Sequence, residues 1–175
     1  MAKKIAIVAM IVILGLVNWS IIGKESLLAE GRIVYLELAP VDPRSLMQGD
    51  YMALRFQMAN AVHKALPKAD EYRGWRQAVD ASDGYVVVGL DAKRVGSFKG
   101  LYQDQSLAED ELRLRFRVRD GEVKFATNAF FFQEGHAQYY EPAKYGQFRV
   151  DDNGELLLVA MYDKDLKRLG PETMD

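Results

Sequence analysis

The sequence contains no cysteine among its 175 residues, and only two histidines. The absence of cysteine excludes a disulfide framework, a thiolate zinc site and a cysteine nucleophile. No charge of one sign dominates, because 23 Lys and Arg face 25 Asp and Glu, for a formal net charge of −2. A dedicated nucleic-acid-binding protein normally carries a basic excess, so this class is not expected. Hydrophobic residues at 49% indicate a packed protein and not a disordered one.

One long segment has no charge at all. Ile5 to Ile22 is an uncharged run rich in Ile, Val, Leu and Met, preceded by Lys3 and Lys4. As a helix it would be roughly 27 Å long, which nearly covers the hydrocarbon core of a bilayer. The pattern predicts a membrane anchor in residues 1–23, crossing the bilayer through residues 5–22, and an exported domain in residues 24–175.

Two other interpretations of the apolar run have to be considered. A buried helix of a soluble domain would carry a polar stripe, whereas Asn18 and Ser20 occur only near the end of this run. A cleavable signal peptide needs small residues one and three positions before the cut, and neither Gly23, with Ile21 before it, nor Ala29, with Leu27 before it, meets this rule. We therefore expect an uncleaved anchor. The positive-inside rule keeps Lys3 and Lys4 in the cytoplasm, which places the domain in the periplasm of a bacterial inner-membrane protein.

The rest of the chain reads as an α+β domain. Short apolar strands separated by turn residues favour a mainly antiparallel sheet that curls into a sandwich or partial barrel, with one or two short helices. We expect a short linker over Gly23 to Gly31. The expected strands are residues 32–38, 51–58, 84–92, 94–102 and 112–119, and the expected helices are residues 59–66 and 71–79.

Two hairpins can be predicted with their register. Asp120-Gly121 suits a two-residue type I′ turn, since both central residues need positive φ. This turn sets Val118 opposite Val123 and, beyond it, Phe116 opposite Phe125. A second two-residue turn is expected at Asn153-Gly154, and it sets Val150 opposite Leu157 and Phe148 opposite Val159.

The most distinctive string begins with a turn and continues as a strand. Gly49 and Asp50 form the turn, and Tyr51, Leu54 and Phe56 follow it. This string resembles the signature after which the GDYXXLXY family is named, with Phe56 in place of the final Tyr. The replacement keeps an aromatic ring and removes a hydroxyl group, so a hydrogen bond from that position is not expected here.

A second block extends the resemblance. The aromatic run Phe130 to Phe132 leads into a Glu-Gly pair and then a Tyr-Glu pair, as in the family. A Val and a Pro commonly precede the family's Glu-Gly, whereas Phe132 and Gln133 stand here. We expect the middle ring of the run to face away from its two neighbours. The residues of this block that match the family are Glu134, Gly135, Tyr140 and Glu141.

The resemblance covers roughly Ile33 to Leu169, and it implies a location more than a reaction. Members of this family are exported, membrane-tethered proteins of unassigned activity, often encoded beside multi-span membrane proteins. The expected role is therefore a non-enzymatic accessory or binding subunit of an integral membrane complex, without cofactor. The two blocks would form a structural or recognition corner of the domain.

A hydrolase is the main enzymatic alternative. Asp50, Glu134 and Glu141 lie in the two blocks, and paired carboxylates act as acid and base in glycoside hydrolysis. A structural role, in which they cap turns or pair with Arg44, Arg55 or Arg149, explains the same residues. A metal site built from His63 and His136 with these glutamates lacks any spacing motif, and none is expected.

A serine peptidase is not expected. The string after Pro43 faintly resembles type I signal peptidases, whose serine should stand at the position of Pro40. Ser45 lies on the other side of Pro43, and no Lys occurs between Lys24 and Lys64 to activate it. The chain could be at most a non-catalytic relative of these β domains.

One strand displays a row of cations. Arg113, Arg115, Arg117 and Arg119 alternate with apolar residues, so the four guanidinium groups share one strand face. The row could dock an acidic partner or phosphate headgroups. We favour a solvated sheet face balanced by nearby carboxylates, namely Glu111, Asp120 and Glu122.

Overall fold

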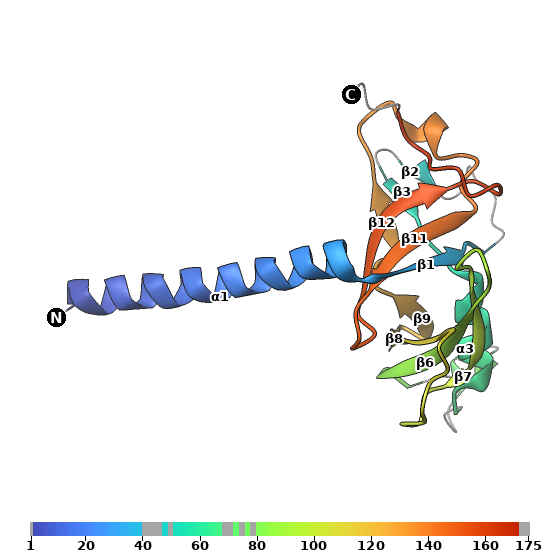
Figure 1. Ribbon diagram of the computed structural model, residues 1–175, viewed down its shortest axis with the longest axis horizontal. Helices are drawn as coiled ribbons and strands as arrows, with labels where there is room; N and C mark the ends of the chain where they lie inside the picture. The colour runs from blue at the N-terminus through green and yellow to red at the C-terminus, as the bar shows by residue number, and fades with distance from the viewer. Residues whose placement is uncertain are drawn as a thin grey trace.

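The structure is a computed structural model that describes residues 2–39, 47–48, 51–67, 72–73, 76–77 and 80–171. It consists of one long N-terminal helix and a β-rich domain at the end of that helix (Figure 1). The domain contains mainly antiparallel sheets and one short helix packed against them. The predicted class, a mainly antiparallel α+β domain after an apolar helix, is confirmed.

Helix α1, Ala2–Glu30, is long and apolar enough to cross a membrane. It does not stop at Gly23, so the segment expected as a linker over Gly23 to Gly31 is helical as far as Glu30. A single Gly costs only about 1 kcal/mol in a helix interior, and good helix formers such as Leu27, Leu28 and Ala29 continue the turns beyond it. The helix therefore runs directly into the domain.

The junction between α1 and the domain is packed. Leu27 is only 6% exposed, and the end of α1 lies against β11 (Tyr145–Val150) and β12 (Leu156–Tyr162). The amide of Gly31 donates to the Leu27 carbonyl at 3.0 Å, and the Arg149 guanidinium donates to the Gly31 carbonyl at 2.8 Å. A cation at the end of a helix also offsets its dipole. These contacts fix the direction of the helix relative to the domain.

The largest sheet has four strands in the order β7-β6-β8-β9. These are β6 (Ser82–Leu90), β7 (Gly96–Leu101), β8 (Glu111–Arg119) and β9 (Glu122–Phe125). The predicted pair of strands at residues 84–92 and 94–102 is confirmed. So is the first hairpin, because Val118 pairs with Val123 and both turn residues have positive φ, 56° at Asp120 and 73° at Gly121.

A second sheet has the order β1-β11-β12, with β1 spanning Arg32–Glu37. Its β11–β12 hairpin is formed as expected, but the predicted register is wrong by one residue. Val150 pairs with Leu156 instead of Leu157, and Phe148 pairs with Leu158 instead of Val159. The loop has three residues, not two, because the Asp151 amide donates to the Glu155 carbonyl at 3.1 Å.

Three connections of the domain have a loop of this same type. In each, the first Asp accepts two backbone amides with its carboxylate and a third with its carbonyl, and its own amide donates to the fifth residue. The fourth residue has positive φ, as in a type I turn followed by a left-handed residue. The three loops are 91–95, 151–155 and 163–167, with Arg94, Gly154 and Leu166 at the left-handed position.

The segment between β1 and β6 differs more from the prediction. Strand β3 is only Tyr51–Ala53, shorter than the predicted strand at residues 51–58, and helix α3 begins early, at Gln57–Ala65. Met58 and Val62, four residues apart, are buried from one face of this helix. The predicted helix at residues 71–79 is wrong, because β4 (Tyr72–Arg73) pairs with β5 (Arg76–Gln77). Gly74, a poor helix former, stands between them in the sequence.

The core lies where the faces of the sheets meet α3. Helix α3 contacts β7 and β9, and Figure 1 shows it on the side of the sheet turned away from α1. The largest fully buried side chains include Phe125 from β9 and Phe148 from β11. Since this core joins strands from Val34 to Met161, the described part of the domain packs around one apolar centre.

Candidate functional site

The two family-like blocks meet on one small sheet. Strand β10, Ala129–Phe131, pairs antiparallel with β3, which sets Phe131 opposite Tyr51 and Phe130 opposite Met52. Strand β2, Met47–Gln48, pairs with β3 on its other side. Residues almost eighty positions apart in the sequence are thus neighbours. We call this region the aromatic corner and define it as Tyr51, Phe130, Phe131, Phe132, Tyr139 and Tyr140.

The outer layer of the aromatic corner is open to solvent. Phe131 is 74% exposed, and its ring lies 5.7 Å from the ring of Tyr51. Tyr139, which ends the 3-10 helix η1 (Ala137–Tyr139), is 40% exposed and contacts the ring of His136 edge-on at 5.3 Å. The expected outward turn of the middle Phe of the run is therefore confirmed. Exposed rings that lie together make this corner a candidate interaction surface.

The inner layer of the aromatic corner anchors these exposed rings. Tyr140 is 8% exposed, and it packs edge-on against Phe130 at 5.0 Å and stacks on Phe132 at 5.3 Å. Aromatic pairs at such separations contribute about 0.5–1.5 kcal/mol each beyond the area they bury. The corner therefore combines one buried ring, two half-buried rings packed against it, and the exposed rings of Phe131 and Tyr139.

The Glu-Gly pair of the second block forms a turn. The His136 amide donates to the Gln133 carbonyl at 3.0 Å, and Gly135 has φ 79°, the value a type II turn requires at its third residue. Glu134 and Glu141 are both exposed. Gly49 and Asp50, the start of the first block, lie outside the described residues.

The remaining residues of the first block belong to the core. Leu54 is 5% exposed and Phe56 is 4% exposed. The Phe56 ring packs edge-on against Phe148 at 5.4 Å and Phe125 at 6.4 Å. A ring without a hydroxyl group suits this apolar site, so the replacement of the family's Tyr is explained by packing.

The arginines suggested as ion-pair partners of Glu134 and Glu141 have other partners. Arg55 lies 3.8 Å from Glu122, and Arg149 donates to the Gly31 carbonyl, so neither is the partner of Glu134 or Glu141. His63 lies on α3, whereas His136 lies in the β10–β11 connection. Across the residues that the structure places, no three His, Asp or Glu side chains form a group suited to a metal ion.

The arginine row is engaged within the domain. Arg115 forms an ion pair with Asp83 at 3.0 Å and a second with Glu155, and Arg119 reaches Asp83 at 2.7 Å. Hydrogen bonds donated by Arg115 and then by Arg119 lower the pKa of Asp83. The hydrogen bonds that Arg115 donates to Glu155 and Asp83 raise the pKa of Arg115. The carboxylate partners are thus Asp83 and Glu155, and not the expected Glu111, Asp120 and Glu122.

The two other arginines of the row bind backbone carbonyls. Arg113 donates to the Asp152 carbonyl at 2.9 and 3.1 Å, and Arg117 donates to the Ala126 carbonyl at 2.9 Å. Arg113 also lies over the rings of Tyr85 and Tyr102, at 5.4 and 5.7 Å. The row therefore connects β8 to neighbouring segments, which the expectation of a solvated sheet face did not include.

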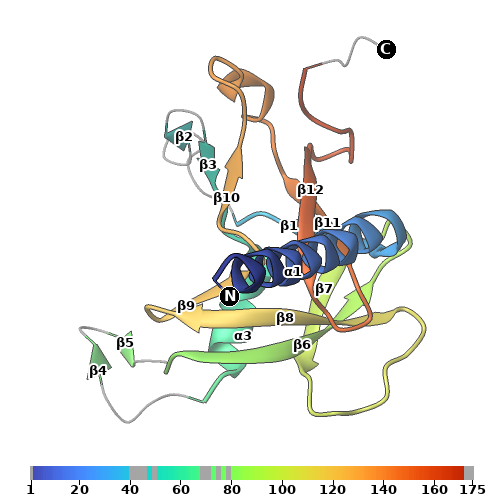
Figure 2. The ribbon, with the colours of Figure 1, turned by 90° about the vertical axis from the view of Figure 1, so that its left-hand side faces the viewer.

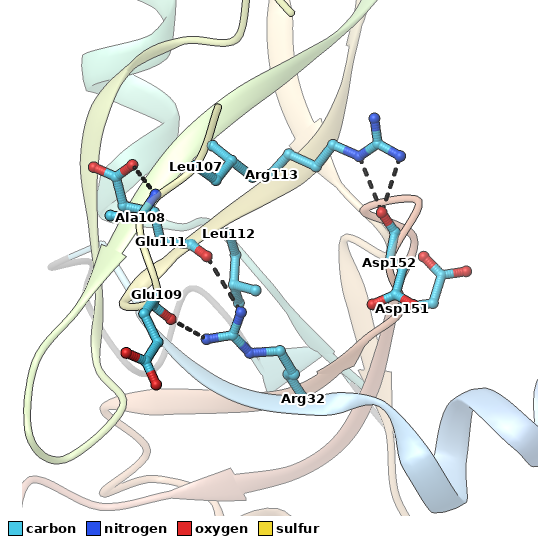
Figure 3. A pocket seen from close by; sticks show the side chains of 9 residues that line it. All are labelled: Arg32, Leu107, Ala108, Glu109, Glu111, Leu112, Arg113, Asp151 and Asp152. Carbon is cyan, nitrogen blue, oxygen red and sulfur yellow. Dashed lines mark hydrogen bonds between the residues drawn. The ribbon is translucent and has the colours of Figure 1, made fainter. Parts of the chain in front are cut away.

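A polar pocket of about 510 Å³ lies close to the end of α1 (Figure 3). Arg32, two residues beyond the helix, donates to the carbonyls of Glu109 at 3.0 Å and Glu111 at 3.3 Å. Arg113 reaches across to the Asp152 carbonyl on the opposite side. Both guanidinium groups therefore hold loops in place. Sequence reasoning missed this pocket, because its walls come from four separate segments: residues 32, 107–109, 111–113 and 151–152.

The family assignment agrees with these features. The family model described as GDYXXLXY protein matches residues 13–161, so the chain belongs to the GDYXXLXY family. No curated protein and no solved structure matches the chain. The match includes the second half of α1, the aromatic corner and most of β12.

Proposed function

We propose, from its place in the GDYXXLXY family, that the chain is a single-pass protein of the bacterial inner membrane. Residues 5–22 cross the bilayer, Lys3 and Lys4 stay in the cytoplasm, and the domain lies in the periplasm. The domain acts without catalysis, as an accessory subunit that binds an integral membrane protein through the aromatic corner. The exposure of Phe131 and Tyr139 at the aromatic corner is the observation that carries this proposal.

The chemistry of the corner favours binding. Aromatic side chains dominate the energetic centres of protein interfaces, because they bury large areas and lose little conformational entropy. Phe131 presents most of its ring to solvent while Tyr51 supports one side of it. The glutamates nearby are exposed, whereas a catalytic acid usually needs burial to shift its pKa.

The position of the corner favours a partner in the same membrane. Figure 2 looks toward the side of the domain from which α1 leaves, and β2, β3 and β10 lie to one side of the helix. The junction at Leu27 and Gly31 holds them there. A neighbouring protein embedded in the same bilayer can present its periplasmic surface at this height, so the corner is well placed to bind it.

The decisive experiment is affinity purification of the full-length protein from detergent-solubilised membranes, followed by mass spectrometry. We expect a multi-span membrane protein to co-purify with the wild type and to be lost with Phe131→Ala. Leu107→Ala, which alters the pocket instead of the corner, is the matched control and should retain the partner. Loss of the partner with Leu107→Ala alone would move the site to the pocket.

Location is tested separately. The protein should stay in membranes washed with alkaline carbonate, and a periplasm-active reporter fused after Asp175 should be active. Release by carbonate would contradict the anchor, and a silent periplasmic reporter with an active cytoplasmic one would reverse the orientation. Retention in the membrane with no co-purifying membrane protein would refute the accessory role and leave the anchor intact.

A further inference from the structure

Asn18 is a strongly polar side chain within the apolar part of α1. Its Nδ2 group donates to the Leu14 carbonyl at 2.8 Å, which uses one of the hydrogen-bonding positions of the amide. Asn18 stands four residues before Ile22, so it lies about 6 Å inside the end of the apolar run. In a bilayer no water can serve the remaining donor and acceptor, and a second helix can.

Asn18 also selects one face of the helix. Positions three and four residues apart follow one another along one side of a helix, which is the heptad spacing of coiled coils. Counted from Asn18, this spacing defines a seam in which Ile11, Asn18 and Glu25 hold the a positions. Glu25 lies beyond the apolar run, where water and salt screen like charges. In coiled coils a single Asn at an a position specifies the register and the number of helices. The seam consists of Ile7, Ile11, Leu14, Asn18, Ile21, Glu25 and Leu28.

The domain leaves this seam free. Leu27, which packs against the domain, comes nine residues after Asn18, and a rotation of about 100° per residue places it on the opposite side of α1. Leu28 belongs to the seam and is 46% exposed, although it lies beyond the apolar run. In Figure 2 the end of α1 joins the domain close to one of its edges, so a neighbouring helix has space.

We propose that the seam binds the seam of a second copy of this chain, in a parallel helix pair with Asn18 opposite Asn18. A carboxamide both donates and accepts hydrogen bonds, so two identical amides complement each other. Two copies inserted in the same direction bring Asn18 to the same depth. Leu28 of one copy then packs against Leu28 of the other copy, outside the hydrocarbon core. The pairing rests on the proposed membrane anchor, and it leaves the aromatic corner available to another partner.

Disulfide crosslinking in isolated membranes tests this pairing, since the chain has no cysteine of its own. Leu14→Cys places a thiol in the seam, and Leu16→Cys places one on the opposite side of the helix at similar depth. We expect oxidation to give a covalent dimer of the full-length protein with Leu14→Cys and little with Leu16→Cys. Equal crosslinking at both positions would overturn the proposal.

The role of the amide is tested in the same background. Asn18→Leu should lower the association constant, obtained from the crosslinked fraction of Leu14→Cys at several protein-to-lipid ratios, by roughly threefold to thirtyfold, the range that interhelical hydrogen bonds give in membranes. Ser20→Leu removes a polar group from the opposite face and should change nothing. An unchanged dimer with Asn18→Leu, or crosslinking of Leu14→Cys only to a different protein, would refute the pairing. Carbonate release of the protein would instead refute the anchor itself.

Discussion

Replacing Gly154 by Ala should destabilise the domain more than a turn substitution usually does. Gly154 has φ 84°, in the left-handed region that side chains with a Cβ avoid. A Cβ placed on it would also lie 2.8 Å from the Arg113 carbonyl oxygen. The Gly154 carbonyl accepts the Arg115 amide at 2.8 Å, so any shift of the loop breaks this bond as well.

The expected magnitude has two parts. The left-handed conformation costs a residue with a Cβ about 1–2 kcal/mol. Loss of the bond between Arg115 and Gly154 adds about 0.5–1.5 kcal/mol. The free energy of unfolding should therefore fall by roughly 1.5–3.5 kcal/mol. At about 2–4 °C per kcal/mol for a domain of this size, Gly154→Ala should lower Tm by about 3–14 °C.

The assay is thermal unfolding of the full-length protein in detergent, followed by circular dichroism in the β-sheet region. Gly121→Ala is the matched control, because Gly121 has φ 73° and a Cβ there would meet no atom within 4 Å. The control carries the conformational cost without the clash. A Gly154→Ala protein that melts at the same temperature as the Gly121→Ala protein would refute the docking of this loop on β8.

Three further substitutions test other parts of the structure. Arg94→Gly should raise the urea midpoint and increase the free energy of unfolding by roughly 0.5–1 kcal/mol, because Arg94 is exposed and has φ 63°. Glycine relieves the backbone strain at this φ, and this gain exceeds the free-energy cost of the greater entropy that glycine gives the unfolded chain. Phe56→Tyr restores the family's residue but buries a hydroxyl group among phenylalanine rings, and should cost about 1–3 kcal/mol in the same titration. Since Arg115 and Arg119 lower the pKa of Asp83 below its ordinary 3.8, the stability this carboxylate contributes is present above pH 3.8 and lost as the pH falls through its lowered value. Asp83→Asn should therefore flatten the decline of Tm in acid, and an unchanged decline would contradict the pairing.

Local chemistry made much of the fold predictable. In the β8–β9 hairpin, Asp120 and Gly121 specify the turn and the apolar alternation specifies the same register, so two independent signals agree. The register of the β11–β12 hairpin was predicted wrongly because Asn153-Gly154 is also a good sequence for a two-residue turn. The Asp151 carboxylate binds the amides of Asn153 and Glu155 instead and stabilises a three-residue loop.

The candidate site was predictable in its members but not in its contacts. Motif resemblance identified Tyr51 and the phenylalanine run, yet only the pairing of β3 with β10 shows that Tyr51 lies against Phe131. The arginine row shows the same limit. Alternation places four guanidinium groups on one face, but their partners Asp83 and Glu155 come from β6 and the β11–β12 loop. Contacts between distant segments depend on topology, which a single sequence specifies only weakly.

The rigid junction links the two proposals for this chain. Helix α1 continues from Gly23 to Glu30, so about 12 Å of helix separates the apolar run from the domain. The headgroup layer of one leaflet is roughly 5–8 Å thick, which places the base of the domain just beyond it. A flexible tether would suffice for a protein that meets soluble partners. A helix fixed at Leu27 and Gly31 instead holds the aromatic corner at one height and one rotation about the anchor, and this matters only for a partner held in the same bilayer.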